Sequence, residues 1–441
     1  MSTKVKWTTS FPAHWDIVPA KRLFPESKTR AAEEDEQLSA TQSYGVISQS
    51  EFMHLAGRKV VQLNTNQHLR KRVEIGDFVI SMRSFQGGLE RAWAAGGIRS
   101  SYVVLKPHPN LNLGYYQYFF KSTEYIQALQ STANFIRDGQ DMSYQDFILI
   151  DLPLPPYNEQ KIIAAFLNYE ISRIDKLIAQ QQQLIELLKE KRQAVISHAV
   201  TKGLNPDVPM KDSGVEWLGG IPEHWLRTKI KYIALLTPKK SSISFKNNDE
   251  CTFIPMEKLK RNSLVTDESK LIRDVISGYT YFEDDDLLLA KVTPCFENKN
   301  IAVARGLVNS IGFGSTEIYV LRPTEKIRVN YLLYRLQEDN FIRAATGAMT
   351  GAGGLKRVPS DFLLNYPIAI PPKLEMDAIV AYLNEQEVRY DLMEKNATQA
   401  VQLLQERRTA LISAAVTGKI DVRDWVAPDM QDAEEPQETT V

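Results

Sequence analysis

The feature that most constrains the fold is a long amphipathic segment in the middle of the chain. From about Glu159 to Ala199, apolar residues recur at alternating steps of four and three positions. A mean spacing of 3.5 residues is typical of a coiled-coil interface. The predicted interface positions are Leu167, Ile171, Ile174, Ile178, Ile185, Leu188 and Val195. At 1.5 Å per residue, about forty residues form a rod on the order of 60 Å long, which cannot be buried inside one small domain.

A second segment near the end of the chain repeats the first at an offset of 216 residues. EKRQAVISHAVT, from Glu190 to Thr201, corresponds without a gap to ERRTALISAAVT, from Glu406 to Thr417. The shared register places four further residues at the interface: Leu383, Val401, Leu404 and Leu411. We therefore predict two long antiparallel helices that bury each other, rather than two unrelated helices that each dock on a separate domain.

The composition limits the class of protein. Of the 441 residues, 43% are hydrophobic and 24% are charged, and no apolar run approaches the roughly 20 residues of a membrane span. The first residues lack the apolar core of a signal peptide. Cys251 and Cys295 form neither a disulfide framework nor a zinc pattern. We expect a cytoplasmic protein with no membrane contact and no bound metal.

The charge is unevenly distributed along the chain. The net charge is −1, but regions 1–150 and 211–365 each carry +3 and the tail 421–441 carries −6. The acidic tail thus masks two mildly basic regions. If these regions bind DNA, partner proteins should supply part of the phosphate neutralisation.

The rest of the chain also contains an internal sequence repeat. FPAHWDIVPAKRLF from Phe11 recurs as IPEHWLRTKIKYIA from Ile221, and His14 and His224 in these elements are expected to be hydrogen-bonded structural residues. Short β-branched strands, one short helix from Tyr115 or Tyr331, and a strand ending in Pro-Pro follow in each half. The predicted fold class is α+β, with two pseudo-repeated α/β domains separated by two long antiparallel coiled-coil helices.

The predicted boundaries follow from this repeat. Residues 1–154 form a first α/β domain, which includes the repeated segment 11–24, and residues 155–203 form a first long helix. Residues 204–370 form a second α/β domain, which includes the linker and repeat segment 204–234, and residues 371–420 form a second long helix. Residues 421–441 form an acidic, disordered tail.

Polar loops at equivalent points of the two halves are the best functional candidates. Arg and Lys can donate to guanine O6 and N7, and Gln can pair with adenine N6 and N7. The alternative is ordinary solvated loop polarity. The candidate DNA-contacting residues are Arg83, Ser84, Gln86, Arg137, Gln140, Lys291, Thr293, Lys356 and Arg357.

Fragments that imitate catalytic motifs are incomplete. PPY at Pro155 lacks the Asp or Asn that an amino-methyltransferase loop needs, because Leu154 stands there. GAMTGAGGLKR lacks the spacing of a phosphate-binding loop. We therefore expect no catalytic residues and no cofactor in this chain.

By these motifs the chain resembles the DNA-specificity subunits of type I restriction–modification systems. The matching features are the Pro-x-His-Trp elements at Pro12 and Pro222, the strands that begin at Gly76 and Asp285, the Pro-Pro helix starts at Pro155 and Pro371, the closing VISHAVTKG and LISAAVTGK, and DSGVEWLG from Asp212. Leu374-Glu375-Met376 departs from the family's usual Asn/Glu-Glu-Gln.

The resemblance implies a non-catalytic subunit whose two domains each recognise half of a split double-stranded DNA target. It also implies that the helices set the gap between the half-sites and bind two modification (methyltransferase) subunits. Two ATP-driven restriction subunits would complete the nuclease, and S-adenosylmethionine, ATP and Mg²⁺ would be used by these partners. The alternatives are the recognition part of a fused or type II-like methyltransferase or nuclease, and a scaffold that binds only protein.

Overall fold

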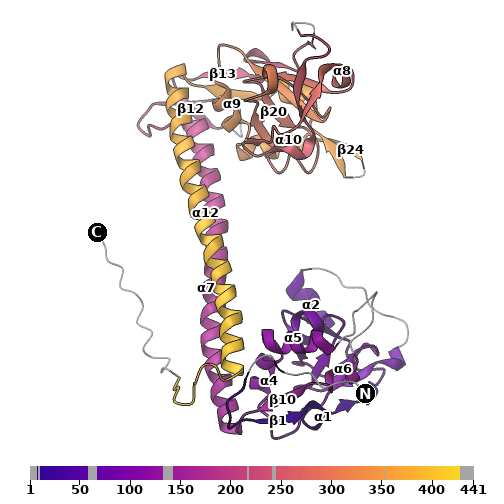
Figure 1. Cartoon of the computed structure of the whole chain (residues 1–441). Helices are drawn as coiled ribbons and strands as arrows, with labels where there is room; N and C mark the ends of the chain where they lie inside the picture. The colour runs from indigo at the N-terminus through magenta and orange to yellow at the C-terminus, as the bar shows by residue number, and fades with distance from the viewer. Residues whose placement is uncertain are drawn as a thin grey trace. The chain divides into compact units, whose positions relative to one another are not determined.

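The computed structural model describes residues 7, 10–57, 67–132, 143–215, 218–240, 245–352 and 354–427. It divides into two compact units. Unit 1 comprises Met1–Gln182 and Gln399–Val441, and unit 2 comprises Gln183–Thr398. Each unit combines a globular α/β part with part of each long helix (Figure 1). The predicted fold class, two α/β domains joined by a pair of long helices, is confirmed.

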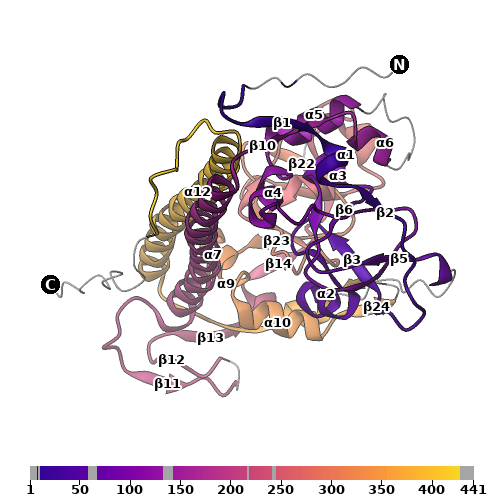
Figure 2. The same cartoon turned by 90° about the horizontal axis from the view of Figure 1, so that it is seen from below.

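The long helices are α7 (Tyr157–Lys202) and α12 (Lys373–Val416). Within each unit they lie side by side, as Figure 1 and Figure 2 both show. Arg408 of α12 donates to Asp175 of α7 at 2.9 Å in unit 1, and Arg192 of α7 donates to Asp391 of α12 at 2.8 Å in unit 2. Both members of the second pair stand 216 residues from their counterparts in the first, so the sequence repeat is also a repeat of contacts.

Each globular part contains the same four-stranded antiparallel sheet. In unit 1 the order is β2 (Glu26–Ser27), β9 (Val103–Leu105), β6 (Phe78–Ile80) and β7 (Glu90–Arg91). In unit 2 the order is β14 (Ala234–Leu236), β23 (Ile318–Pro323), β20 (Leu287–Ala290) and β21 (Ile301–Val303). The sheets agree strand for strand, which shows that the globular parts share one plan.

A buried aspartate precedes the central strand of both sheets. Asp77 pairs with Lys106 at 2.8 Å, and Asp286 pairs with Arg322 at 2.7 Å. A buried carboxylate needs such a partner because burial removes its hydration. Burial raises the pKa of Asp77, although the hydrogen bond from Lys106 opposes the shift. The pairs fix the turn that leads into each central strand.

A second strand pair leads from each globular part into its long helix. β1 (Asp16–Pro19) pairs antiparallel with β10 (Asp151–Leu154), and β13 (Leu226–Lys229) pairs with β26 (Pro367–Ile370). The turns before β1 and β13 carry the repeated histidines. His14 Nε2 lies 2.9 Å from Glu159, and His224 Nε2 lies 2.7 Å from Glu375. The prediction of hydrogen-bonded structural histidines is confirmed.

The single short helix expected in each half was wrong, because each is two helices. They are α4 (Leu113–Phe119) and α5 (Thr123–Thr132) in unit 1, and α9 (Val329–Arg335) and α10 (Asp339–Gly347) in unit 2. Side chains cap the second helix of each pair. The Ser122 hydroxyl accepts from Tyr125 N at 3.3 Å, and the Glu338 carboxylate accepts from Asn340 N at 3.0 Å. These caps satisfy N–H groups that a continuous helix would bond internally.

Buried tyrosines join α4 and α9 to the ends of the long helices. The Tyr115 hydroxyl donates to Val416 O at 2.8 Å, and the Tyr331 hydroxyl donates to Val200 O at 3.2 Å. Both tyrosines are fully buried. Tyr115 precedes α7 in the chain but contacts the end of α12, and Tyr331 precedes α12 but contacts the end of α7. Each globular part therefore packs against both long helices.

The remaining elements differ between the units, except that α6 (Tyr144–Phe147) and α11 (Ser360–Asn365) both precede the strand that leads into a long helix. Unit 1 adds α1 (Ala20–Leu23), β3 (Leu38–Thr41), β4 (Gly45–Ser48), α2 (Gln49–Ala56), β5 (Lys71–Val73), α3 (Ser84–Gly87) and β8 (Gly96–Ile98). Unit 2 adds β11 (Met210–Asp212), β12 (Gly220–Pro222), β16 (Leu259–Lys260), β17 (Ser263–Leu264), α8 (Ile272–Val275), β24 (Thr350–Ala352) and β25 (Leu355–Arg357).

Unit 2 also contains a second four-stranded sheet, in the order β18 (Ser269–Leu271), β15 (Glu250–Ile254), β22 (Ile311–Gly314) and β19 (Thr280–Glu283). Unit 1 has the two-stranded pairs β3–β4 and β5–β8 instead. The variation is therefore concentrated in the globular parts, away from the long helices.

The start of the predicted tail 421–441 packs on α7. Val422 is buried, and the Trp425 ring centroid lies 5.6 Å from that of Phe166 and 5.9 Å from that of Tyr169. Residues 428–441 lie outside the described residues. None of the helices in the described part of the chain is long and apolar enough to cross a membrane.

Candidate nucleic-acid interface

The loop after β6 presents two of the predicted polar residues to solvent. Arg83 lies just before the short helix α3 and Gln86 lies within it, and both side chains are exposed. Ser84 between them is fully buried, and its hydroxyl accepts from Ser81 N at 2.9 Å. Ser84 therefore shapes the loop, whereas Arg83 and Gln86 form its surface.

Side chains behind this loop hold its backbone in place. Gln130 Nε2 donates to Phe85 O at 2.7 Å, and Lys121 Nζ donates to Gly87 O at 2.9 Å. Lys121 also pairs with Glu90 at 2.6 Å. Burial raises the pKa of the Glu90 carboxyl, and the charge of Lys121 opposes that shift. A loop fixed from behind can offer its outer side chains at little cost in conformational entropy.

An exposed aromatic surface that the sequence analysis missed lies in the same unit. Trp93 is 51% exposed, and the Arg91 guanidinium carbon lies 4.4 Å from the centroid of its ring. Gly45 packs closely here, since a Cβ at this position would stand 2.8 Å from Trp93 Nε1. Next to Gly45 in the β3–β4 turn, Tyr44 is also exposed. Trp93 was not among the predicted residues, because a strand pattern does not reveal which of its faces is solvated.

In unit 2 the structure brings together two pairs of candidates, and the pairs are more than sixty positions apart in sequence. Thr293 N donates to Lys356 O at 3.0 Å, and the Thr293 hydroxyl accepts from Lys356 N at 3.0 Å. Val358, the residue that follows Arg357, donates its backbone N–H to Lys291 O at 2.9 Å. The loop after β20 and the hairpin β24–β25 thus form one surface from Lys291, Thr293, Lys356 and Arg357.

The hairpin β24–β25 stands out from the globular part of unit 2 (Figure 1). All six of its strand residues are exposed, and Leu355 is 56% exposed. Arg357 pairs with Glu317, and Lys291 Nζ lies 5.1 Å from the Tyr319 ring centroid. An exposed two-stranded ribbon with basic side chains has dimensions that fit a DNA major groove.

The remaining candidates, Arg137 and Gln140, lie outside the described residues. Their segment connects α5 to α6, as β24–β25 connects α10 to α11. Among the residues that the structure describes, no group of three or more His, Cys, Asp or Glu side chains is arranged to hold a metal ion.

The predicted interface residues of the long helices are all buried or half-buried. Leu167, Ile171, Ile174 and Leu383 are buried, and Ile178, Ile185, Leu188, Val195, Val401, Leu404 and Leu411 are half-buried. Other leucines face outward from the same helices. Leu187 and Leu403, which correspond in the repeat, are 52% and 56% exposed, and Leu177 and Leu184 are also exposed.

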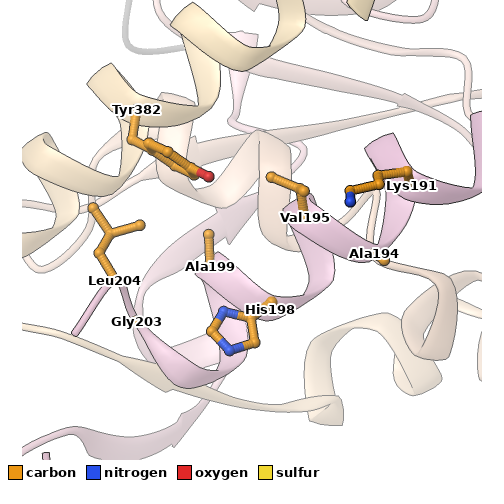
Figure 3. Close-up of a pocket in the computed structure, with 8 residues that line it drawn as sticks. All are labelled: Lys191, Ala194, Val195, His198, Ala199, Gly203, Leu204 and Tyr382. Carbon is orange, nitrogen blue, oxygen red and sulfur yellow. The ribbon is translucent and has the colours of Figure 1, made fainter. Parts of the chain in front are cut away.

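A groove of about 680 Å³ lies beside the end of α7 in unit 2. Figure 3 shows Tyr382 of α12 facing Val195 and Ala199 of α7, with Leu204 beside them. His198 and Lys191 are the titratable residues of its lining apart from Tyr382. The other lining residues are apolar or glycine, and His198 and Lys191 are both exposed.

Known proteins similar to this chain are type I restriction enzyme specificity subunits. No family model matches this chain. The chain is 34% identical over 210 residues to the EcoAI type I restriction enzyme specificity subunit of Escherichia coli, and 32% identical over 196 residues to the EcoEI specificity subunit of the same species. These segments cover 47% and 44% of this chain but only 33% of each relative's own length. The EcoKI specificity subunit of E. coli K12 is 23% identical over 347 residues, which cover 74% of this chain and 70% of that one.

Solved structures share the fold. A chain from a structural study of assembly and conformational transition in the type I R-M system matches 93% of this chain with a TM-score of 0.67 and 15% identity. The HsdS subunit of Thermoanaerobacter tengcongensis matches 94% with a TM-score of 0.54 and 15% identity. The resemblance to type I specificity subunits is confirmed by these relatives.

Proposed function

We propose that this chain, whose curated relatives are specificity subunits of type I restriction enzymes, is the DNA-specificity subunit of such a complex. It recognises a bipartite double-stranded target, with one globular domain for each half-site. The observation that carries the proposal is the duplication: both units contain the same sheet, with a polar loop at the same connection, on a scaffold of shared helices.

The residues on the two loop surfaces suit base recognition. Arg83 and Gln86 in unit 1, and Arg357 in unit 2, carry donors that match guanine or adenine in the major groove. The regions that contain them carry only +3 each, which is small for a tight autonomous DNA binder. We therefore expect the chain to bind weakly alone and to gain affinity from its partners.

The partners in this proposal are two modification subunits and two restriction subunits. Outward-facing leucines on the long helices offer apolar surface for a protein partner, and Leu187 and Leu403 place equivalent surface on α7 and α12. Two equivalent surfaces favour two copies of the same modification subunit. The complex would act in the cytoplasm, on cellular DNA.

The chemistry in this proposal belongs to the partners. They carry out adenine methylation or ATP-dependent cleavage, using S-adenosylmethionine, ATP and Mg²⁺, while this chain selects the site. The absence of complete catalytic motifs in the sequence supports a non-catalytic role.

The test is methylation mapping of a host that expresses this chain with its modification subunit. We expect a split motif of two short half-sites separated by a gap of constant length. Replacing residues 25–150 by the same region of another specificity subunit should change one half-site, and replacing residues 235–365 should change the other. The proposal is wrong if methylation shows no motif, or if either exchange alters both halves together.

A further inference from the structure

Arg357 at the end of β25 is held in one orientation by Glu317. Its Nε donates to Glu317 Oε2 at 2.9 Å, and its Nη2 donates to Glu317 Oε1 at 2.5 Å. The side chains are 47% and 28% exposed, so the pair lies at the surface. These hydrogen bonds hold the pKa of Glu317 below its ordinary value, which keeps the carboxylate ionised at neutral pH.

The backbone beneath Arg357 is fixed from two sides. The Thr293 hydroxyl donates to Gly354 O at 2.7 Å, and Val292 forms a β-bridge with Arg357. Val358, the next residue, is buried, and its carbonyl accepts from the Tyr319 hydroxyl at 2.8 Å. The guanidinium is therefore positioned before any ligand arrives.

The hairpin also depends on close contact between its strands. A Cβ on Gly351 would stand 2.3 Å from Leu355 O, at a φ of +142° that favours glycine. Glycine at this position lets β24 approach β25, and Arg357, which pairs with Thr350, stands at the base of the ribbon beside the buried Val358.

The pair with Glu317 decides which ligand suits Arg357. Arginine has five N–H donors, and the carboxylate occupies the side formed by Nε and Nη2. Nη1 has no hydrogen-bond partner among the described residues, so the side formed by Nη1 and Nη2 remains open. Two parallel N–H donors match O6 and N7 of guanine. A phosphate is a poorer match, because the adjacent carboxylate cancels the charge that attracts it.

We propose that Arg357 contacts a guanine in the major groove of the half-site bound by unit 2, and that Glu317 is its positioning residue. This inference rests on the proposed function of unit 2 as a DNA-recognition domain. It makes Arg357 a determinant of specificity, and it leaves neighbouring lysines such as Lys356 for the phosphate backbone.

The test uses the full chain in complex with its modification subunit, with methylation motifs and binding to matched duplexes as readouts. Arg357→Lys keeps the positive charge but removes the two parallel N–H donors of the guanidinium. We expect it to lower the preference for guanine at one position about 5- to 150-fold and to leave the other half-site unchanged. Glu317→Ala should relax the same position, and Glu317→Gln, which retains one acceptor, should relax it less.

Lys356→Gln is the matched control, one residue away on the same strand. It should weaken binding to all sequences alike, reduce the salt slope by about 1 and leave the motif intact. Circular dichroism and thermal unfolding should show that all four variants fold, since these side chains are at least partly exposed.

Three results would overturn the inference: a unit 2 half-site without any G·C pair, an Arg357→Lys variant with an unchanged motif, or a uniform loss of binding in that variant. A uniform loss would identify a phosphate contact. The proposed function would survive each of these, because it fails only if the wild-type complex shows no bipartite motif.

Discussion

Arg192 of α7 donates to both carboxylate oxygens of Glu387 on α12, with Nε at 3.0 Å from Oε1. Both side chains are only 11% exposed. Burial lowers the pKa of Arg192, but its hydrogen bonds to Glu387 and Asp391 and the charges of these carboxylates together raise it above the ordinary value. The position that corresponds to Glu387 in the repeat is the buried Ile171. In unit 1 the counterpart of Arg192, Arg408, therefore pairs with Asp175 instead.

Removing Glu387 should destabilise the protein, because the buried guanidinium of Arg192 would keep only Asp391, a much more exposed residue, as a hydrogen-bond partner. We expect Glu387→Ala to lower the free energy of unfolding by about 3 kcal/mol. Asp175→Ala is the control, since it removes the exposed pair with Arg408 and should cost less than about 1 kcal/mol. Urea unfolding measures both, and equal losses in the two variants would show that burial does not distinguish the pairs.

The helix pair is expected to set the gap between the half-sites. Four residues inserted after Gln182, with four matching residues after Thr398, would lengthen both helices by about 6 Å. Since DNA rises about 3.4 Å per base pair, the gap should grow by one or two base pairs with both half-sites unchanged. Methylation mapping tests this. An unaltered gap would mean that the helices only bind partners.

The two buried tyrosines should each contribute to the attachment of a domain. Tyr115→Phe and Tyr331→Phe remove the hydroxyls that donate to Val416 O and Val200 O. We expect each to lower the free energy of unfolding by about 1 kcal/mol, because a buried acceptor loses its partner. Tyr118→Phe, which removes a more exposed hydrogen bond to Asn168, should have a smaller effect in the same measurement. A larger effect of the control would contradict the assignment.

The buried Glu90 should make stability depend on pH. Burial raises its folded-state pKa, so the folded protein takes up this proton more readily than the unfolded chain. Its contribution to stability therefore falls as pH rises from the unfolded pKa through the folded one. Glu90→Gln removes this titration while an oxygen acceptor for Lys121 remains. The stability of the variant relative to wild type should increase with pH across that window in thermal unfolding series, and a constant difference would refute the prediction.

The local pattern of the sequence predicted the long helices and the duplication correctly. Helix α7 begins two residues before Glu159 and ends three residues after Ala199, the limits that the apolar spacing indicated. Periodicity is a local property of a helix and can therefore be recognised without a partner. The division into α4 and α5 was missed because it depends on a single cap at Ser122, in a segment that is apolar on both sides.

The sequence predicted which residue types the candidate interface contains, but it did not predict which of these side chains are exposed. Polar loops at repeated positions indicated Arg83, Gln86, Lys291 and Arg357, and these are at least partly exposed. Ser84 has the same kind of side chain as its neighbours in that loop, yet it is buried. A hydroxyl serves equally well as a surface donor and as an internal acceptor, and packing against the sheet decides between them.

The sequence by itself determined that this protein is one unit written twice around two long helices, because repeats and heptad spacing are carried by neighbouring residues. Only the tertiary structure decided that Thr293 meets Lys356, that Glu317 holds Arg357, and that Glu387 meets Arg192. Each of these pairs joins elements at least forty positions apart in the chain. Such contacts are set by how strands and helices pack against a common core, and no local pattern records that packing.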